Sequence, residues 1–181
     1  CRRLCSRYAL VAWWPLAPSR RMCLSRARRH LASPSPKPKS LQQAGAHVAS
    51  SLQAAVTDVG VVMLSLPGPT QVAQVMLGDE GMLNMLGQGT TVIDTTTSSV
   101  ALIQQLVALA EKNGVHYLEA PVTNAVDFAT LGRLSIFVGG SLTAFETHKP
   151  IFEVIGEKIF HVGKAGNGAT VKLLTNLLWF V

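Results

Sequence analysis

Residues 59–66 read VGVVMLSL and are followed at once by Pro67-Gly68-Pro69. This short apolar run is bounded by residues that end regular structure, since proline lacks the backbone N–H that helices and sheets use. Such a run is typical of a parallel strand whose two faces are both covered by helices. It therefore predicts an α/β protein, in which further strands alternate with helices along the chain.

The rest of the chain follows this alternation. The clearest helix is expected over 100–113, where apolar side chains recur at the spacing of one helix face and Gly114 follows. A helix over 142–155 contains Pro150, which predicts a break near that residue. The other expected elements are strands over 91–94, 115–118, 134–138 and 158–162, helices over 52–57 (capped by Ser50 or Ser51) and 70–77, and short elements over 41–46, 47–49 and 82–86.

Four short segments follow expected strands and would meet at one edge of the sheet. They are residues 66–67, 95–98, 123–124 and 166–168. Parallel sheets bind ligands beyond the carboxyl ends of their strands. The convergence of four separate segments there predicts a ligand site at this edge.

The last stretch, residues 163–181, reads GKAGNGATVKLLTNLLWFV, a glycine-rich turn that runs into an apolar helix. Lys172 and Asn176 are four residues apart, so they lie on one helix face, one turn apart. A lysine among apolar neighbours is either a surface residue with a buried stem or an ammonium held in a site. The expected position of this turn at the ligand edge favours the site. None of the five scattered histidines is a candidate.

Charge is distributed unevenly along the chain. Residues 1–40 contain eight arginines, two lysines and no acid, whereas the remainder carries six basic and ten acidic residues. A mildly acidic folded part argues against a nucleic-acid-binding body. The basic segment has the composition of an organelle transit peptide; a polybasic tail that touches membrane or RNA, and an error in the gene structure, are the alternatives. The expected location is the mitochondrial or another organelle matrix for a transit peptide, and otherwise the cytoplasm.

Cysteine and hydropathy patterns exclude several classes. All three cysteines precede residue 24, without a CxxC pair, so neither a disulfide framework nor a metal site is expected. The apolar run over 8–16 is interrupted by Pro15 and is far shorter than the ~20 residues that span a bilayer. The segment over 33–40 alternates serine, proline and lysine and is expected to be a stiff linker.

Several motifs resemble the β-hydroxyacid dehydrogenase family, whose members include 3-hydroxyisobutyrate dehydrogenase and, more distantly, 6-phosphogluconate dehydrogenase. Residues 120–134 read APVTNAVDFATLGRL and are followed by Gly139-Gly140, similar to the family's substrate segment. The family's catalytic pattern G-x-x-G-x-G-x-x-x-K-x-x-x-N is complete over 163–176. The apolar strand ending in Leu66-Pro67, and Asp94 with the hydroxyls that follow it, match the nucleotide side. The resemblance covers about residues 40–181.

The resemblance implies hydride transfer between a nicotinamide cofactor, NAD or NADP, and a small β-hydroxy acid. Lys172 would be the general acid and base at the substrate oxygen, and burial would lower its pKa toward working pH. Asn176 would orient the substrate. The other implied contacts are Thr123, Asn124 and Ala125 to the substrate, and Leu66, Pro67 and Thr97 to the cofactor.

The chain departs from the family at three places. Family members begin with a strand and a G-x-G-x-x-G turn that holds the cofactor pyrophosphate, but the first glycine here is Gly45. Residues 8–14 are a candidate for the vacated strand position, although no glycine turn follows them. The family also continues beyond the lysine helix into a helical domain. Asn124-Ala125 replaces a Gly-Gly pair, and Phe128 replaces another glycine.

The expected fold is therefore an α/β, incomplete Rossmann-like parallel sheet with helices on both faces. It would lack the first strand, glycine turn and helix, and the C-terminal all-helical domain. The expected divisions are a basic, disordered arm over 1–40, a partial NAD(P)-binding domain over 41–165, and the start of an interdomain catalytic helix over 166–181.

Three hypotheses remain open at this point. The chain is a weakly active or inactive piece of such a dehydrogenase, or a working dehydrogenase that holds its cofactor in an unusual way. The third is a non-catalytic remnant that binds a partner through its basic arm or its apolar C-terminal tail. The apolar residues over 177–180 also favour self-association.

Overall fold

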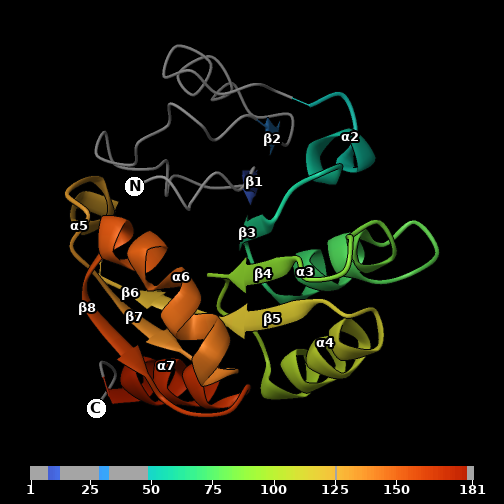
Figure 1. The fold of residues 1–181 in the computed structure, drawn as a ribbon. Coiled ribbons are helices and arrows are strands. Elements are labelled where there is room, and N and C mark those ends of the chain that lie inside the picture. The colour runs from blue at the N-terminus through green and yellow to red at the C-terminus, as the bar shows by residue number, and fades with distance from the viewer. Residues whose placement is uncertain (1–7, 13–28, 33–48, 125, 179–181) are drawn as a thin grey trace.

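The computed structural model describes residues 8–12, 29–32, 49–124 and 126–178 and contains two sheets (Figure 1). A five-stranded sheet has the order β2-β1-β3-β4-β5, and a three-stranded sheet has the order β6-β7-β8. In the first sheet all pairs are parallel. Its strands are β1 (Tyr8–Ala12), β2 (Arg29–Ala32), β3 (Val61–Ser65), β4 (Thr91–Asp94) and β5 (His116–Glu119).

The apolar run that predicted the fold class forms β3. This strand lies between β1 and β4, and four of its five residues are buried. Val62 and Leu64 belong to the core that includes Val72 of α3 (Pro69–Met76) and Leu106 of α4 (Val100–Lys112). The prediction of a covered parallel strand is confirmed.

β1 lies within residues 8–14, the candidate for the vacated first-strand position, so that candidate is confirmed and the expectation of a missing first strand is wrong. Residues 8–12 pair with β3 on one side and with β2 on the other. An unpaired edge of β3 would leave a row of backbone N–H and C=O groups without partners, and an extended apolar segment satisfies them. Residues 1–40 therefore supply two strands to the sheet, in contrast to the disordered arm that we expected. The predicted linker over 33–40 and the elements predicted over 41–48 lie outside the described residues.

Hydroxyl side chains cap two of the helices. Ser51 accepts a hydrogen bond from the Ala54 backbone N–H (3.1 Å) at the start of α2 (Leu52–Val56). Ser99 accepts one from the Leu102 backbone N–H (3.3 Å) at the start of α4. Each cap satisfies an N–H group that the helix itself leaves unpaired. A short 3-10 helix, η2 (Met82–Asn84), precedes β4.

The second sheet was not predicted as a separate unit. It contains β6 (Val122–Thr123), β7 (Leu134–Val138) and β8 (Gly156–His161), with β6 antiparallel to β7. A bridge between Glu119 and Gly139 connects the end of β5 to the end of β7. Helices α6 (Leu142–Ile155) and α7 (Asn167–Leu178) pack on this sheet (Figure 1), and α5 (Val126–Thr130) joins β6 to β7.

Helix α6 runs through Pro150, so the predicted break is wrong. Proline removes the N–H that would bond to the carbonyl of residue 146. Both Glu146 and Pro150 are exposed. Water can therefore satisfy that carbonyl, which lowers the cost of keeping the helix continuous. Among the described helices, none is both long and apolar enough to cross a membrane.

Candidate functional site

Lys172 lies on the inward face of α7. Only 8% of its surface is exposed, whereas its neighbours Leu173 and Leu174 are 47% and 55% exposed. A surface lysine with a buried stem would be more exposed than Lys172, because its charged end would lie in water. The structure therefore supports the second reading of the sequence, an ammonium held inside the molecule.

Burial also determines the electrostatics of this lysine. Loss of solvent lowers the pKa of the Lys172 ammonium below its usual value. Within the described part of the chain, no ion pair or hydrogen bond joins this ammonium to another side chain. A lysine in this state gives up its proton more readily than a solvated one, as a general acid and base requires.

Asn176 follows Lys172 by one turn and is half-buried, while Leu177 beside it is exposed. The two predicted residues thus share the inward side of α7. Thr123 is half-buried in β6, opposite Ser135 of β7. No hydrogen bond between described residues connects Thr123 or Asn176 to Lys172, and their roles remain predictions.

The glycines of the catalytic segment have a structural basis. Gly166 has φ +97°, a left-handed conformation that residues with a Cβ rarely adopt. At Gly168 a Cβ would lie 2.5 Å from the backbone oxygen of Phe137 in β7. The first turn of α7 therefore packs directly on the backbone of β7.

Glu119 is a residue that the sequence reading missed. It ends β5, is 1% exposed, and accepts hydrogen bonds from the backbone N–H groups of Gly166, Gly168 (2.9 Å) and Ala169 (3.1 Å). Burial raises the pKa of its carboxyl, and these three hydrogen bonds act in the opposite direction. The available signal was an acidic residue at the end of a buried strand, directly before Ala120-Pro121.

Polar groups after β4 tie the neighbouring strand ends together. Asp94 accepts hydrogen bonds from the Thr96 backbone N–H (2.9 Å) and the Tyr117 hydroxyl (2.7 Å). The Thr96 hydroxyl accepts one from the Leu66 backbone N–H (3.0 Å). Asp94 is therefore held by structural partners, and Leu66 lies beside the hydroxyl cluster as the sequence predicted.

The carboxyl edge of the five-stranded sheet has polar groups that a nicotinamide cofactor could contact, but it lacks the glycine turn that binds the cofactor pyrophosphate in the family. The Ser98 hydroxyl is buried without a hydrogen-bond partner among the described residues, which leaves a polar atom for a ligand. Pro67 is exposed and Thr97 is half-buried, so both are accessible. However, the residues after β1 read WWPLAPSR over 13–20, without the glycines that bring backbone N–H groups to a pyrophosphate.

The predicted substrate segment leaves β6 in an unusual conformation. Asn124 has φ +87°, and its side-chain amide donates hydrogen bonds to the Arg133 backbone oxygen (3.3 Å) and the Ser135 hydroxyl (3.4 Å). Asparagine tolerates this left-handed conformation better than most residues, which accounts for its place where the family has glycine. Ala125 lies outside the described residues. Phe128 is exposed, with the Arg133 guanidinium 5.9 Å above its ring.

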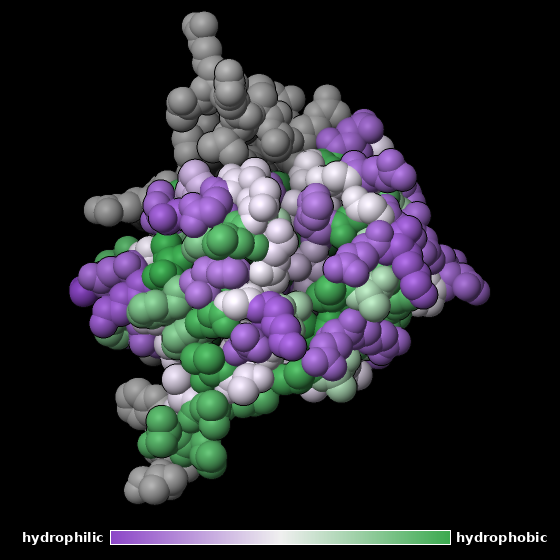
Figure 2. Space-filling view, turned by 60° about the horizontal axis from the view of Figure 1, so that its bottom comes forward, coloured by the Kyte–Doolittle hydropathy of each residue, from purple (hydrophilic) through white to green (hydrophobic). Residues whose placement is uncertain are grey.

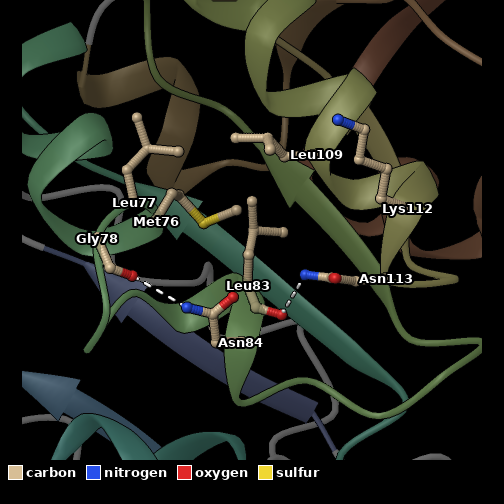
Figure 3. A pocket seen from close by; sticks show the side chains of 8 residues that line it. All are labelled: Met76, Leu77, Gly78, Leu83, Asn84, Leu109, Lys112 and Asn113. Atoms are coloured by element: carbon tan, nitrogen blue, oxygen red, sulfur yellow. Dashed lines mark hydrogen bonds between the residues drawn. The ribbon is translucent and has the colours of Figure 1, made fainter.

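A pocket of about 240 Å³ lies elsewhere, between the ends of α3 and α4 and η2 (Figure 3). Its lining combines apolar side chains such as Met76 and Leu83 with Lys112. Asn84 and Asn113 donate their amide protons to the backbone oxygens of Gly78 (3.0 Å) and Leu83 (3.1 Å). Helices that return antiparallel to the strands place this pocket at the opposite edge of the sheet from Lys172. It is not the predicted site.

The family assignment rests on sequence similarity to known proteins. A sequence model described as the NAD binding domain of 6-phosphogluconate dehydrogenase matches residues 32–163. The chain belongs to this family. The match includes the strand ends around Leu66, Asp94 and Glu119 and stops at the glycine turn before α7.

Individual relatives agree with this assignment. The chain is 36% identical over 138 residues to an NAD-dependent L-serine dehydrogenase of Pseudomonas aeruginosa, covering 76% of this chain and 46% of the relative. It is 34% identical over 134 residues to a 2-(hydroxymethyl)glutarate dehydrogenase of Eubacterium barkeri, covering 74% and 44%. The chain thus spans about half the length of these curated relatives.

A solved structure supports the same relationship. The 3-hydroxyisobutyrate dehydrogenase of Mycobacterium tuberculosis, solved with L-serine, matches with a TM-score of 0.83 and 27% identity, covering 96% of this chain and 60% of that one. The resemblance to β-hydroxyacid dehydrogenases and the Rossmann-like α/β fold are both confirmed.

Proposed function

We propose that this chain supplies the nicotinamide-binding half and the catalytic lysine of a β-hydroxyacid dehydrogenase. The observation that carries the proposal is the inward position of Lys172 on α7, with its pKa lowered by burial. An ammonium in a site with little water can stabilise the charge that develops on a carbonyl oxygen and then transfer its proton.

The names of three relatives indicate a substrate class. L-serine, 3-hydroxyisobutyrate and 2-(hydroxymethyl)glutarate all carry a hydroxymethyl group on the carbon next to a carboxylate. They differ in the third substituent on that carbon. We propose a substrate with the same hydroxymethyl-carboxylate unit for this chain.

Each predicted residue has a place in this scheme. Lys172 accepts the hydroxyl proton on oxidation and returns it on reduction. Bound NAD or NADP supplies the hydride chemistry. Asn176, Thr123, Asn124 and Ala125 hold the substrate, and Leu66, Pro67 and Thr97 hold the cofactor.

A chimera tests the assignment of Lys172. Residues 49–178 would replace the corresponding part of the Pseudomonas aeruginosa relative, and turnover of L-serine and 3-hydroxyisobutyrate would be measured. We expect Lys172→Ala to lower turnover by about 10²-fold or more, whereas Lys164→Ala, at an exposed position in the same segment, retains it. Equal turnover in the folded chimera with and without Lys172 would refute the proposed role.

A titration tests cofactor binding by the chain alone. NADH and NADPH would be added while cofactor fluorescence is followed. We expect weak binding, because the sequence after β1 lacks the glycine turn. Micromolar affinity would show that the phosphates are held in another way.

The second candidate function is association through the outer face of α7, and we propose a second copy of the chain as the partner. Leu173, Leu174, Leu177 and Leu178 are all exposed on this helix. Figure 2 shows apolar residues gathered at one end of the molecule, and these four leucines give α7 an apolar outer face. Contiguous apolar surface of this kind is typical of an interface.

We also propose that the basic segment directs the chain to an organelle matrix. Ten basic residues and no acidic residue over 1–40 support this proposal. Fusion of residues 1–40 to a fluorescent protein provides the test, with the eight arginines replaced by glutamine as the control. Uniform cytoplasmic fluorescence of the unmodified fusion would contradict it.

A further inference from the structure

One glycine of the substrate segment and one of the catalytic segment lie against the same carboxylate, that of Glu119. Gly139 belongs to the substrate segment, and a Cβ at this position would overlap the Glu119 carboxylate. Gly168 belongs to the catalytic segment, and a Cβ there would lie 3.2 Å from Cδ of Glu119. Both glycines leave room for the same buried side chain.

The Glu119 carboxylate takes the place of a local helix cap. A helix usually satisfies its first N–H groups with a side chain from the residue just before it. Here the acceptor comes from β5, 47 to 50 residues earlier in the chain. One oxygen accepts from Gly166 and Gly168, and the other accepts from Ala169. Glu119 therefore attaches the start of α7 to the five-stranded sheet.

Lys172 lies close to this attachment. Ala169, the last residue whose N–H is held, precedes Lys172 by three residues, about 4.5 Å along a helix. A shift of the helix start would therefore move Lys172 by nearly the same distance. The hydrogen bonds of the Glu119 carboxylate are with backbone groups, and within the described residues it has none to Lys172.

We infer that Glu119 is a positioning residue that docks α7 onto the sheet and thereby sets the depth at which Lys172 is buried. Its importance for catalysis rests on the proposed function, but its effect on Lys172 does not. The occupied helix start also cannot serve as an anion site, so a substrate carboxylate must be held by other groups.

Four variants of the chain test this inference. Glu119→Ala removes all three acceptors, and Glu119→Gln keeps one oxygen while placing an amide group where the other was. Gly139→Ala displaces the Glu119 side chain without removing it. Asp94→Asn is the matched control, because Asp94 is also a buried strand-end carboxylate but accepts from Thr96 and Tyr117 rather than from α7.

The measurement is the titration of the Lys172 amine by NMR in protein labelled with ¹³C at lysine Cε, with the signal assigned by Lys172→Arg. Undocking of α7 would expose the ammonium and raise its pKa toward that of a solvated lysine. We expect a large upward shift in Glu119→Ala, an intermediate one in Glu119→Gln and Gly139→Ala, and none in Asp94→Asn.

Two results would overturn the inference. One is an unchanged Lys172 titration in folded Glu119→Gln or Gly139→Ala. These two milder variants test the inference even if Glu119→Ala does not fold. The other is an equal shift in Asp94→Asn. Turnover of the chimera separates the two proposals. If the NMR shifts are as expected but Lys172→Ala leaves turnover unchanged, the positioning role of Glu119 is supported and the proposed dehydrogenase function is refuted.

Discussion

Lys172 is expected to reduce stability while it serves function. Its pKa is lowered in the folded state, so folding at pH 7 must keep a charged group buried. This cost is present below the folded-state pKa and declines as pH rises toward the unfolded value of 10.5. Lys172→Met should therefore increase the free energy of unfolding by about 1 kcal/mol at pH 7, with a smaller gain at pH 10.

Urea unfolding at the two pH values measures this difference. Lys164→Met is the control, because Lys164 is exposed and its replacement should change the free energy of unfolding little at either pH. A less stable Lys172→Met protein at pH 7 would show that the ammonium is well solvated or paired.

Tyr117 is expected to stabilise the fold through Asp94. Burial raises the pKa of the Asp94 carboxyl, and the Tyr117 hydroxyl bond opposes that rise. Without the hydroxyl, the Asp94 pKa would rise further, and the stability linked to a raised pKa is lost as pH increases through it. Tyr117→Phe should therefore lower the free energy of unfolding by about 2 kcal/mol at pH 7, and by less at pH 4.

A double-mutant cycle with Asp94→Asn checks the origin of that loss. The penalty of Tyr117→Phe should become smaller and lose its pH dependence once residue 94 cannot ionise. An undiminished penalty in the double variant would assign it to packing rather than to the hydrogen bond.

At the level of elements, helix propensity and packing have opposite effects at Gly168, where α7 contacts β7. Alanine is favoured over glycine inside a helix by about 1 kcal/mol. At Gly168 the added Cβ would lie 2.5 Å from the Phe137 backbone oxygen, which cannot rotate away. We expect packing to prevail, so Gly168→Ala should destabilise the chain by about 2 kcal/mol, measured by thermal or urea unfolding.

Gly87→Ala is the matched control for this substitution. Gly87 is exposed, and the nearest atom to an added Cβ is 4.0 Å away. Its replacement should be close to neutral. A neutral Gly168→Ala would mean that α7 can move away from β7 at little cost, which would also weaken the positioning role of Glu119.

The sequence pattern predicted those elements that are determined by residues close together in the chain. The strand around Val62 and Leu64, the helix α4 and the cap at Ser51, one of the two serines expected there, follow from residues that are close in sequence. Lys172 was identified because its motif is contiguous. Glu119 was missed because its partners are backbone groups 47 to 50 residues away; its place at the end of a buried strand signals a buried acid but does not identify those partners.

The division into two sheets was missed for a related reason. A strand of alternating burial such as β7 resembles any other short strand in sequence. Its pairing with the two-residue β6 depends on the reversal of the chain around Asn124, whose left-handed conformation is set by its contacts with Arg133 and Ser135. The continuity of α6 through Pro150 likewise depends on solvent access rather than on residue type.

At the scale of the whole molecule, the outer face of α7 should control association. Each leucine buried at an interface contributes about 1.5–3 kcal/mol. Leu174→Gln combined with Leu178→Gln should therefore weaken self-association at least tenfold, since about 1.4 kcal/mol corresponds to that factor. Sedimentation velocity over a range of concentrations measures the effect.

Leu142→Gln serves as the control for this experiment. Leu142 is as exposed as Leu174 but lies at the start of α6. Its substitution should leave the association constant unchanged. A wild-type chain that stays monomeric at all concentrations would contradict association through α7.

The pairing of β1 on both sides bears on the fate of the basic segment. A peptidase that removed residues 1–40 after import would withdraw β1 and β2 together and leave β3 as an open edge of hydrogen-bonding groups. Such an edge recruits strands from other molecules, so processed chains would aggregate unless another segment took the vacant place. The segment that we propose as a targeting signal also supplies β2 and β1 at one end of the five-stranded sheet, so its removal would expose the edge of β3.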